Sequence, residues 1–135
     1  MAETRLLPEA PGVIYFPEGV PGFESLREFV LLQEQDLLPL VFLVSPVEPR
    51  ICLPVVPIQK ISPDYDVRLG DEDRAVLGLA GGEHPKILCL AVVSLGDGSQ
   101  PATANLLAPI VINLKNWTAR QVVQADSSYP VAAEV

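Results

Sequence analysis

Residues able to carry out catalysis are few in this sequence, and they lie far apart along the chain. His84 is the only histidine, and it sits between a glycine pair and a proline in the segment GGEHPK. Acid–base or nucleophilic catalysis needs a second group, such as a serine or cysteine, held next to the histidine. No spacing in the sequence provides such a pair. We therefore interpret His84 as a solvated turn residue and expect a protein without enzymatic activity.

The two cysteines form neither a metal motif nor a redox motif. Cys52 lies in the apolar segment ICLPV and Cys89 in the apolar segment ILCLA, and no CxxC spacing occurs. Because a free cysteine behaves as a small apolar residue, we expect two reduced, buried thiols. A chain with one histidine is also poorly equipped to bind zinc. The sequence thus predicts no metal and no organic cofactor.

Carboxylates make the only dense cluster of ionisable side chains. Five of them fall within residues 64–73, namely Asp64, Asp66, Asp71, Glu72 and Asp73. A calcium loop of the EF-hand type starting at Asp64 would require an oxygen ligand, a glycine and a glutamate where the chain has Arg68, Leu69 and Ala75. This excludes an EF-hand. Two interpretations stay open: a solvated loop that leads into a helix start, or an acidic surface that docks a basic protein.

The overall charge argues against direct binding of nucleic acid. The 135-residue chain carries a formal net charge of −8, and its nine lysines and arginines are scattered. Contacts to phosphates need clustered basic residues. We expect a protein partner instead.

The hydropathy pattern predicts a cytoplasmic protein. The longest apolar stretch, residues 87–95, is about half of the roughly 20 residues needed to cross a membrane. The amino terminus, MAETRLLPEAPG, has two glutamates and no apolar core, unlike a signal peptide.

Proline spacing organises the chain into short elements. Fourteen prolines leave few windows for a long helix, and between them lie apolar runs of strand length. The expected strands are residues 13–16, 28–33, 40–45, 50–56, 86–95, 110–114 and 120–125. Many short strands separated by turn residues are typical of a sandwich or a small barrel. We expect one mostly β domain over residues 1–135.

One helix is expected, over residues 71–79. Asp71 is a candidate N-cap, and the glycine pair Gly81-Gly82 a candidate stop. Asp97-Gly98 predicts a type I′ hairpin turn that pairs residues 86–95 with a strand starting near residue 102. Pro54 cannot donate a ladder hydrogen bond, which predicts an edge or a bulge at its strand.

Two apolar segments stand out without containing catalytic groups. The first, FPEGVPGFE (residues 16–24), lacks the lysine and serine of a phosphate loop, and its Pro21-Gly22 pair suits a type II turn. The second, TANLLAPIVINL (residues 103–114), is an apolar run bounded by asparagines and interrupted by Pro109. Its residues 106–112 are interpreted as core rather than as a ligand groove.

Several blocks together resemble one protein family. FPEGVPGFE, PDYDVRL (residues 63–69), TANLLAPIVIN and RQVVQ (residues 120–124) are similar, in order and spacing, to the FliW flagellar assembly factor family. The resemblance covers about residues 13–131. It implies a small antiparallel β-barrel-like fold and no enzymatic activity. We expect the protein to be a monomer.

The resemblance also implies partners. Members of the family bind flagellin and, alternatively, the RNA-binding translational repressor CsrA, so that the flagellin level controls flagellin translation. We expect CsrA to meet the acidic stretch, and flagellin to meet apolar side chains exposed near residues 106–112. The expected contact residues are Asp64, Tyr65, Asp66, Glu72 and Asp73 for the first partner, and Leu106, Leu107, Pro109 and Val111 for the second. The alternative is a small barrel that binds a small molecule or acts as an enzyme.

Overall fold

A computed structural model describes residues 12–20, 22–79 and 86–135 of the chain. Within these residues it contains nine strands, one α-helix and two 3₁₀ helices. The strands are β1 (Ile14–Tyr15), β2 (Glu28–Gln33), β3 (Val41–Val44), β4 (Cys52–Pro57), β5 (Ile87–Ser94), β6 (Thr103–Ala104), β7 (Ile110–Asn113), β8 (Thr118–Gln121) and β9 (Ala133–Glu134). The helices are η1 (Gln35–Leu37), η2 (Ile58–Lys60) and α1 (Asp71–Leu77). The expectation of a mostly β fold with a short helix is confirmed.

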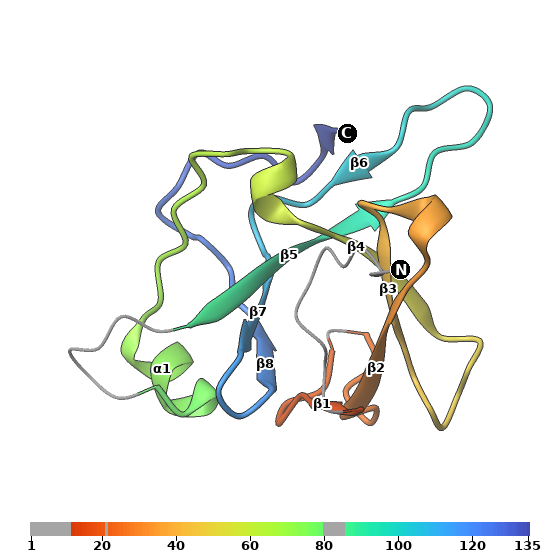
Figure 1. Cartoon of the computed structure of the whole chain (residues 1–135). Coiled ribbons are helices and arrows are strands. Elements are labelled where there is room, and N and C mark those ends of the chain that lie inside the picture. The colour runs from red at the N-terminus through yellow and green to blue at the C-terminus, as the bar shows by residue number, and fades with distance from the viewer. Residues whose placement is uncertain (1–11, 21, 80–85) are drawn as a thin grey trace, which may run out of the picture.

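The strands close into a barrel (Figure 1). Neighbouring strands follow the order β4-β3-β2-β1-β8-β7-β5, and β4 pairs with β5 to complete the circle. These pairings are antiparallel except that of β1 with β8, which is parallel. The small strands β6 and β9 extend β5 at one end, where Val93 pairs with Ala104. The barrel implied by the resemblance is thus confirmed.

The barrel wall separates two hydrophobic clusters. On β7, Ile110 and Ile112 belong to the cluster inside the barrel, whereas Val111 belongs to a second cluster outside it. Successive side chains of a strand point to opposite faces, so β7 is buried on both sides. The outer cluster also includes Ile58 of η2 and Leu77 of α1. The segment from η2 to α1 therefore covers the outer side of β5 and β7.

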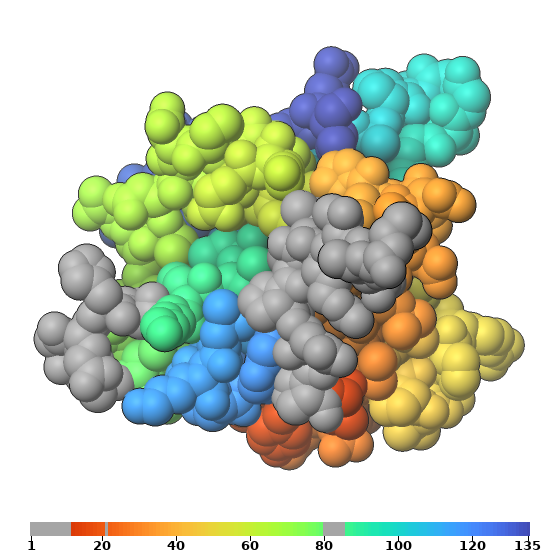
Figure 2. Space-filling view, viewed as in Figure 1, coloured from red at the N-terminus to blue at the C-terminus, as the bar shows by residue number. Residues whose placement is uncertain are grey.

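Figure 2 shows this cover from one side. The yellow-green segment before α1 and the green α1 lie at the left of the view, whereas the yellow β3–β4 hairpin forms the right edge. Among the described residues, the outer side of β5 and β7 is covered by the segment from η2 to α1, and β2, β3 and β4 form the other half of the barrel wall.

Helix α1 starts near the expected place but is capped differently. Its N-cap is Gly70 rather than Asp71, and the Asp73 Oδ2 atom accepts the Gly70 N–H at 2.8 Å. The helix ends at Gly78, which has φ +72°, a conformation that favours glycine. It is therefore shorter than residues 71–79. Gly81, Gly82 and His84 lie outside the described residues.

The predicted pairing of β5 with the strand after residue 102 is confirmed, but the predicted type I′ turn is wrong. Neither Asp97 nor Gly98 has a positive φ. The Asp97 Oδ1 atom instead accepts the N–H groups of Ser99 and Gln100, at 2.8 and 3.0 Å. An aspartate that binds the backbone ahead of it stabilises a wider loop, here residues 95–102.

Pro54 was predicted to lie on an edge strand. Its own position is an edge, but the strand β4 as a whole pairs with a strand on each side. Pro54 pairs with Phe42 of β3, and the pairing of β4 with β5 begins only at Val55. The proline thus lies where β4 has a neighbouring strand on one side only.

The strand expected at residues 120–125 lies instead at Thr118–Gln121. The chain after this strand still forms isolated backbone hydrogen bonds, such as the one from the Val122 N–H to the Pro109 carbonyl.

Candidate functional site

The acidic stretch before α1 is fixed in place by long-range hydrogen bonds. The Tyr65 hydroxyl donates to the carbonyl of Leu106, and the Asp66 N–H donates to the Tyr129 hydroxyl at 3.1 Å. The Tyr65 and Tyr129 rings stack with their centroids 4.1 Å apart. Burial raises the pKa of Tyr65 well above its usual range, so its hydroxyl stays a donor. Tyr65 is therefore an anchor beneath the surface rather than a side chain presented to a partner.

A buried glutamine holds the next part of the same stretch. The Gln124 Oε1 atom accepts the Arg68 N–H at 2.7 Å, and its Nε2 group donates to the Arg68 carbonyl at 3.0 Å. The Gln124 side chain thus pairs with both the N–H and the C=O of Arg68, as the backbone of a neighbouring strand would. Gln124 ends the block RQVVQ, but nothing in the sequence marks it as the partner of Arg68.

Arg120, which opens the same block, gathers three carboxylates. Its Nε atom lies 2.8 Å from Glu18, and its Nη1 and Nη2 atoms lie 2.9 Å from Asp73 and 3.5 Å from Glu72. The Arg120 side chain is only 17% exposed. It joins the β1–β2 connection, α1 and β8 in one ion-pair network, and it too was missed, because residues 73 and 120 are far apart in the sequence.

The network separates the predicted acidic contact residues into two kinds. The Asp73 side chain is 21% exposed and both caps α1 and pairs with Arg120, so its role is mainly structural. The side chains of Glu72 and Asp66 are 81% and 76% exposed. Asp64 is exposed as well. A partner approaching this side meets Asp64, Asp66 and Glu72 first.

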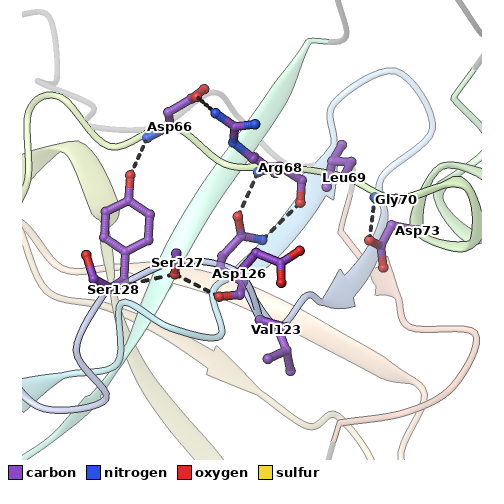
Figure 3. A pocket seen from close by; sticks show the side chains of 12 residues that line it. Asp66, Arg68, Leu69, Gly70, Asp73, Val123, Asp126, Ser127 and Ser128 are labelled. Atoms are coloured by element: carbon purple, nitrogen blue, oxygen red, sulfur yellow. Dashed lines mark hydrogen bonds and ion pairs between the residues drawn. The ribbon is translucent and has the colours of Figure 1, made fainter.

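A groove runs beside the exposed carboxylates (Figure 3). It has a volume of about 860 Å³ and is lined by residues 66, 68–70 and 73 on one side and 123–129 on the other. Asp66 and Arg68 form its upper rim in the view, with 3.9 Å between their charged atoms, and Asp126 and Ser127 face them from below. Its lining is mixed, with carboxylates and hydroxyl groups beside the apolar side chains of Leu69 and Val123.

The apolar segment expected to be exposed is largely internal, and that expectation is wrong. Leu106 and Val111 are buried, as is Pro109, while Leu107 is half-buried. The reason is the burial of β7 on both faces, together with the fold of the preceding loop. There the Asn105 Oδ1 atom accepts the N–H groups of residues 107 and 108, both at 3.0 Å.

The two thiols differ, contrary to the prediction that both are buried. Cys89 is buried in the outer cluster, and this burial raises its pKa to about 11. Cys52, at the start of β4, is exposed, because its side chain points away from both clusters.

Across residues 12–20, 22–79 and 86–135, no three histidine, cysteine or acidic residues are grouped to hold a metal ion. In this part of the chain, no helix is long and apolar enough to span a membrane.

Comparisons with known proteins give a consistent result. Residues 4–135 match the family described as FliW protein. A flagellar assembly factor FliW from Pseudothermotoga lettingae is 42% identical over 119 residues, covering 88% of this chain and 75% of the relative. A flagellar assembly factor FliW from Carboxydothermus hydrogenoformans is 35% identical, with the same coverage of both chains.

A solved structure agrees in fold. The crystal structure of a flagellar assembly factor FliW superposes with a TM-score of 0.81 at 26% sequence identity, covering 96% of this chain and 89% of the other. The family match, the relatives and the shared barrel lead to one conclusion. The chain belongs to the FliW family of flagellar assembly factors.

Proposed function

We propose that this protein is a non-enzymatic, cytoplasmic binding protein that binds flagellin and alternatively CsrA, and so couples the flagellin level to flagellin translation. Its membership of the family of flagellar assembly factors supports the proposal. The observation that carries it is the set of exposed carboxylates on a backbone stretch that Tyr65 and Gln124 hold rigid. A rigid acidic surface suits binding of a basic protein, since little conformational entropy is lost on docking.

CsrA is the proposed partner of the acidic side. A protein that attracts RNA phosphates must present basic residues, and an acidic partner is steered towards them. Among the proposed contacts, Asp64, Asp66 and Glu72 would meet CsrA directly, whereas Tyr65 and Asp73 would hold the surface in shape. Negative charge docked there would repel RNA even without covering its site.

Charge reversal at Asp66 tests this assignment. Asp66→Lys should slow association with CsrA and reduce its salt dependence, because Asp66 is exposed and paired only loosely with Arg68. Glu48→Lys, on the β3–β4 hairpin, changes the net charge equally and serves as the control. Stopped-flow measurements of the rate of association with CsrA, at low and high salt, compare the two variants. Equal association rates for both would remove the acidic surface from the proposal.

Flagellin is the proposed partner of the apolar segment. The amphipathic helices of unassembled flagellin need an apolar surface. Of the four proposed contacts, Leu107 is half-buried, whereas Leu106, Pro109 and Val111 are buried. Leu107→Asp should weaken flagellin binding, measured by calorimetry, more than it lowers the melting temperature. Unchanged flagellin affinity in a folded Leu107→Asp variant would place the flagellin contact elsewhere.

A further inference from the structure

The outer face of β2, β3 and β4 departs from the usual pattern of an antiparallel sheet. Such sheets normally alternate between apolar residues facing the core and polar residues facing water. Here the register aligns two apolar rows on the outward side. The first row is Val30, Val44 and Cys52, and the second is Leu32, Phe42 and Pro54. We refer to these six residues as the outer apolar face.

No residue of the outer apolar face belongs to either hydrophobic cluster of the described chain. The inward positions of the same strands, such as Phe29, Leu43 and Val55, belong to the cluster inside the barrel. Leu32 is 46% exposed, and Leu37 of η1, in the connection that follows β2, is exposed as well. On the opposite side of the barrel, comparable apolar positions of β5 and β7 are covered by α1 and the segment before it.

The dimensions of the outer apolar face suit one helix. Three strands span two interstrand distances, roughly 10 Å, which is about the diameter of an α-helix with its side chains. A helix laid on the face would contact it through side chains spaced three or four residues apart. This is the same kind of cover that α1 provides for the other side of the barrel.

Charge at the edges favours one kind of helix. The connection after β2 carries Glu34 and Asp36, both exposed, and residues 33–40 contain no lysine or arginine. At the other end, Glu48 is paired with Arg50 at 3.7 Å, so the charge there is nearly balanced. A second copy of this chain, with its net charge of −8, would bring further negative charge to the acidic end.

We propose that the outer apolar face is a docking site for an amphipathic helix of a partner protein, with an aliphatic face and basic residues at the end that meets Glu34 and Asp36. This surface is separate from the acidic stretch before α1. The inference does not depend on the identity of the partners proposed above, so it can fail while they stand.

The probe is a designed helical peptide of about five turns, with leucines on one face and lysines at one end. Calorimetry should show binding to the full-length protein, and at least about tenfold weaker binding to Leu32→Glu. Leu95→Glu is the matched control, because Leu95 is also an exposed leucine but lies in the β5–β6 loop rather than on β2, β3 or β4. A peptide with glutamates in place of the lysines should bind more weakly, and Glu34→Lys should reduce this preference.

Several outcomes would overturn the proposal. No binding of the peptide, or equal losses in Leu32→Glu and Leu95→Glu, would show that the face does not dock a helix. A dimer in sedimentation that Leu32→Glu converts to monomers would assign the face to a second copy. Tenfold tighter peptide binding by a Leu6→Glu, Leu7→Glu double variant would assign it to the chain's own amino terminus. If Leu32→Glu does not fold, Leu32→Asn takes its place, and we expect the same loss of peptide affinity.

Discussion

Replacing Arg120 by methionine tests whether the ion-pair network holds α1 to the barrel. Methionine keeps much of the aliphatic stem, which packs at 17% exposure, but removes all three ion pairs. The pair with Asp73, at 2.9 Å, dominates the loss because the Asp73 side chain is only 21% exposed. The pair with Glu18 is as short, at 2.8 Å, but the Glu18 side chain is 51% exposed. A charge-assisted hydrogen bond in such a position contributes about 1.5–3 kcal/mol. The more exposed Glu18 and Glu72 add about 0–1 kcal/mol together after solvent screening.

We therefore expect Arg120→Met to lower the free energy of unfolding by about 2–3 kcal/mol, or the melting temperature by roughly 10 °C for a domain of this size. Circular dichroism during thermal and urea unfolding measures both. Arg50→Met is the matched control: Arg50 also forms an ion pair, but its side chain is 92% exposed and 3.7 Å from Glu48. We expect that change to cost less than about 0.5 kcal/mol.

A double-mutant cycle with Asp73→Asn separates the dominant pair from the rest. If the two changes together cost no more than the larger single change, the pair accounts for the effect. The reasoning is refuted if Arg120→Met unfolds within about 0.5 kcal/mol of the unchanged protein. It is refuted equally if Arg50→Met loses as much stability, since exposure would then not decide the strength of these pairs.

Four further predictions concern the surroundings of single residues. Gln124→Leu leaves a backbone N–H and C=O without their side-chain partner, and urea unfolding should show a loss of about 1–2 kcal/mol; an unchanged midpoint would mean that water replaces both bonds. Gly19→Ala should cost more stability than Gly22→Ala, because a Cβ at the first lies 2.6 Å from a backbone Cα and the second has open space; equal losses would contradict this. Iodoacetamide should modify Cys52 in the folded protein and Cys89 only after unfolding, and equal rates would place both thiols at the surface. Because burial raises the pKa of Cys89 from 9.0 to about 11, the unfolded chain loses that proton first, and the free energy of unfolding should fall as the pH rises through this interval.

The sequence predicted elements better than it predicted their boundaries. Strand β2 was expected at residues 28–33 and lies there, because prolines and a turn at Phe23 isolate one apolar run. The α1 prediction found the helix but not its cap, since Asp71 and Asp73 are both suitable residue types and only the fold shows which one meets the Gly70 N–H. Local propensity thus identified the elements, and tertiary contacts decided their ends.

The residues that shape the acidic surface were beyond local reasoning. Gln124 binds a residue 56 positions away, and Arg120 one that is 47 positions away. A polar residue inside a strand-like run is ambiguous in sequence, because it can face water or satisfy a buried backbone group. Only the pairing of β7 with β8 and the path of the loop before α1 bring these partners together.

Apolar binding surfaces are equally hard to recognise in a sequence. For residues 106–112 the sequence predicted a core segment, and also exposed side chains that meet flagellin. The core interpretation is confirmed, because a strand that is apolar throughout is one that the fold buries on both faces. A docking surface is better sought in strands whose second face is apolar and is left out of the hydrophobic clusters formed by residues 12–20, 22–79 and 86–135. Leu32 and Phe42 meet that description only because the β2–β3 register aligns them and both hydrophobic clusters exclude them. Neither condition is visible before the register is known, since a shift of one residue would turn the same side chains into the core.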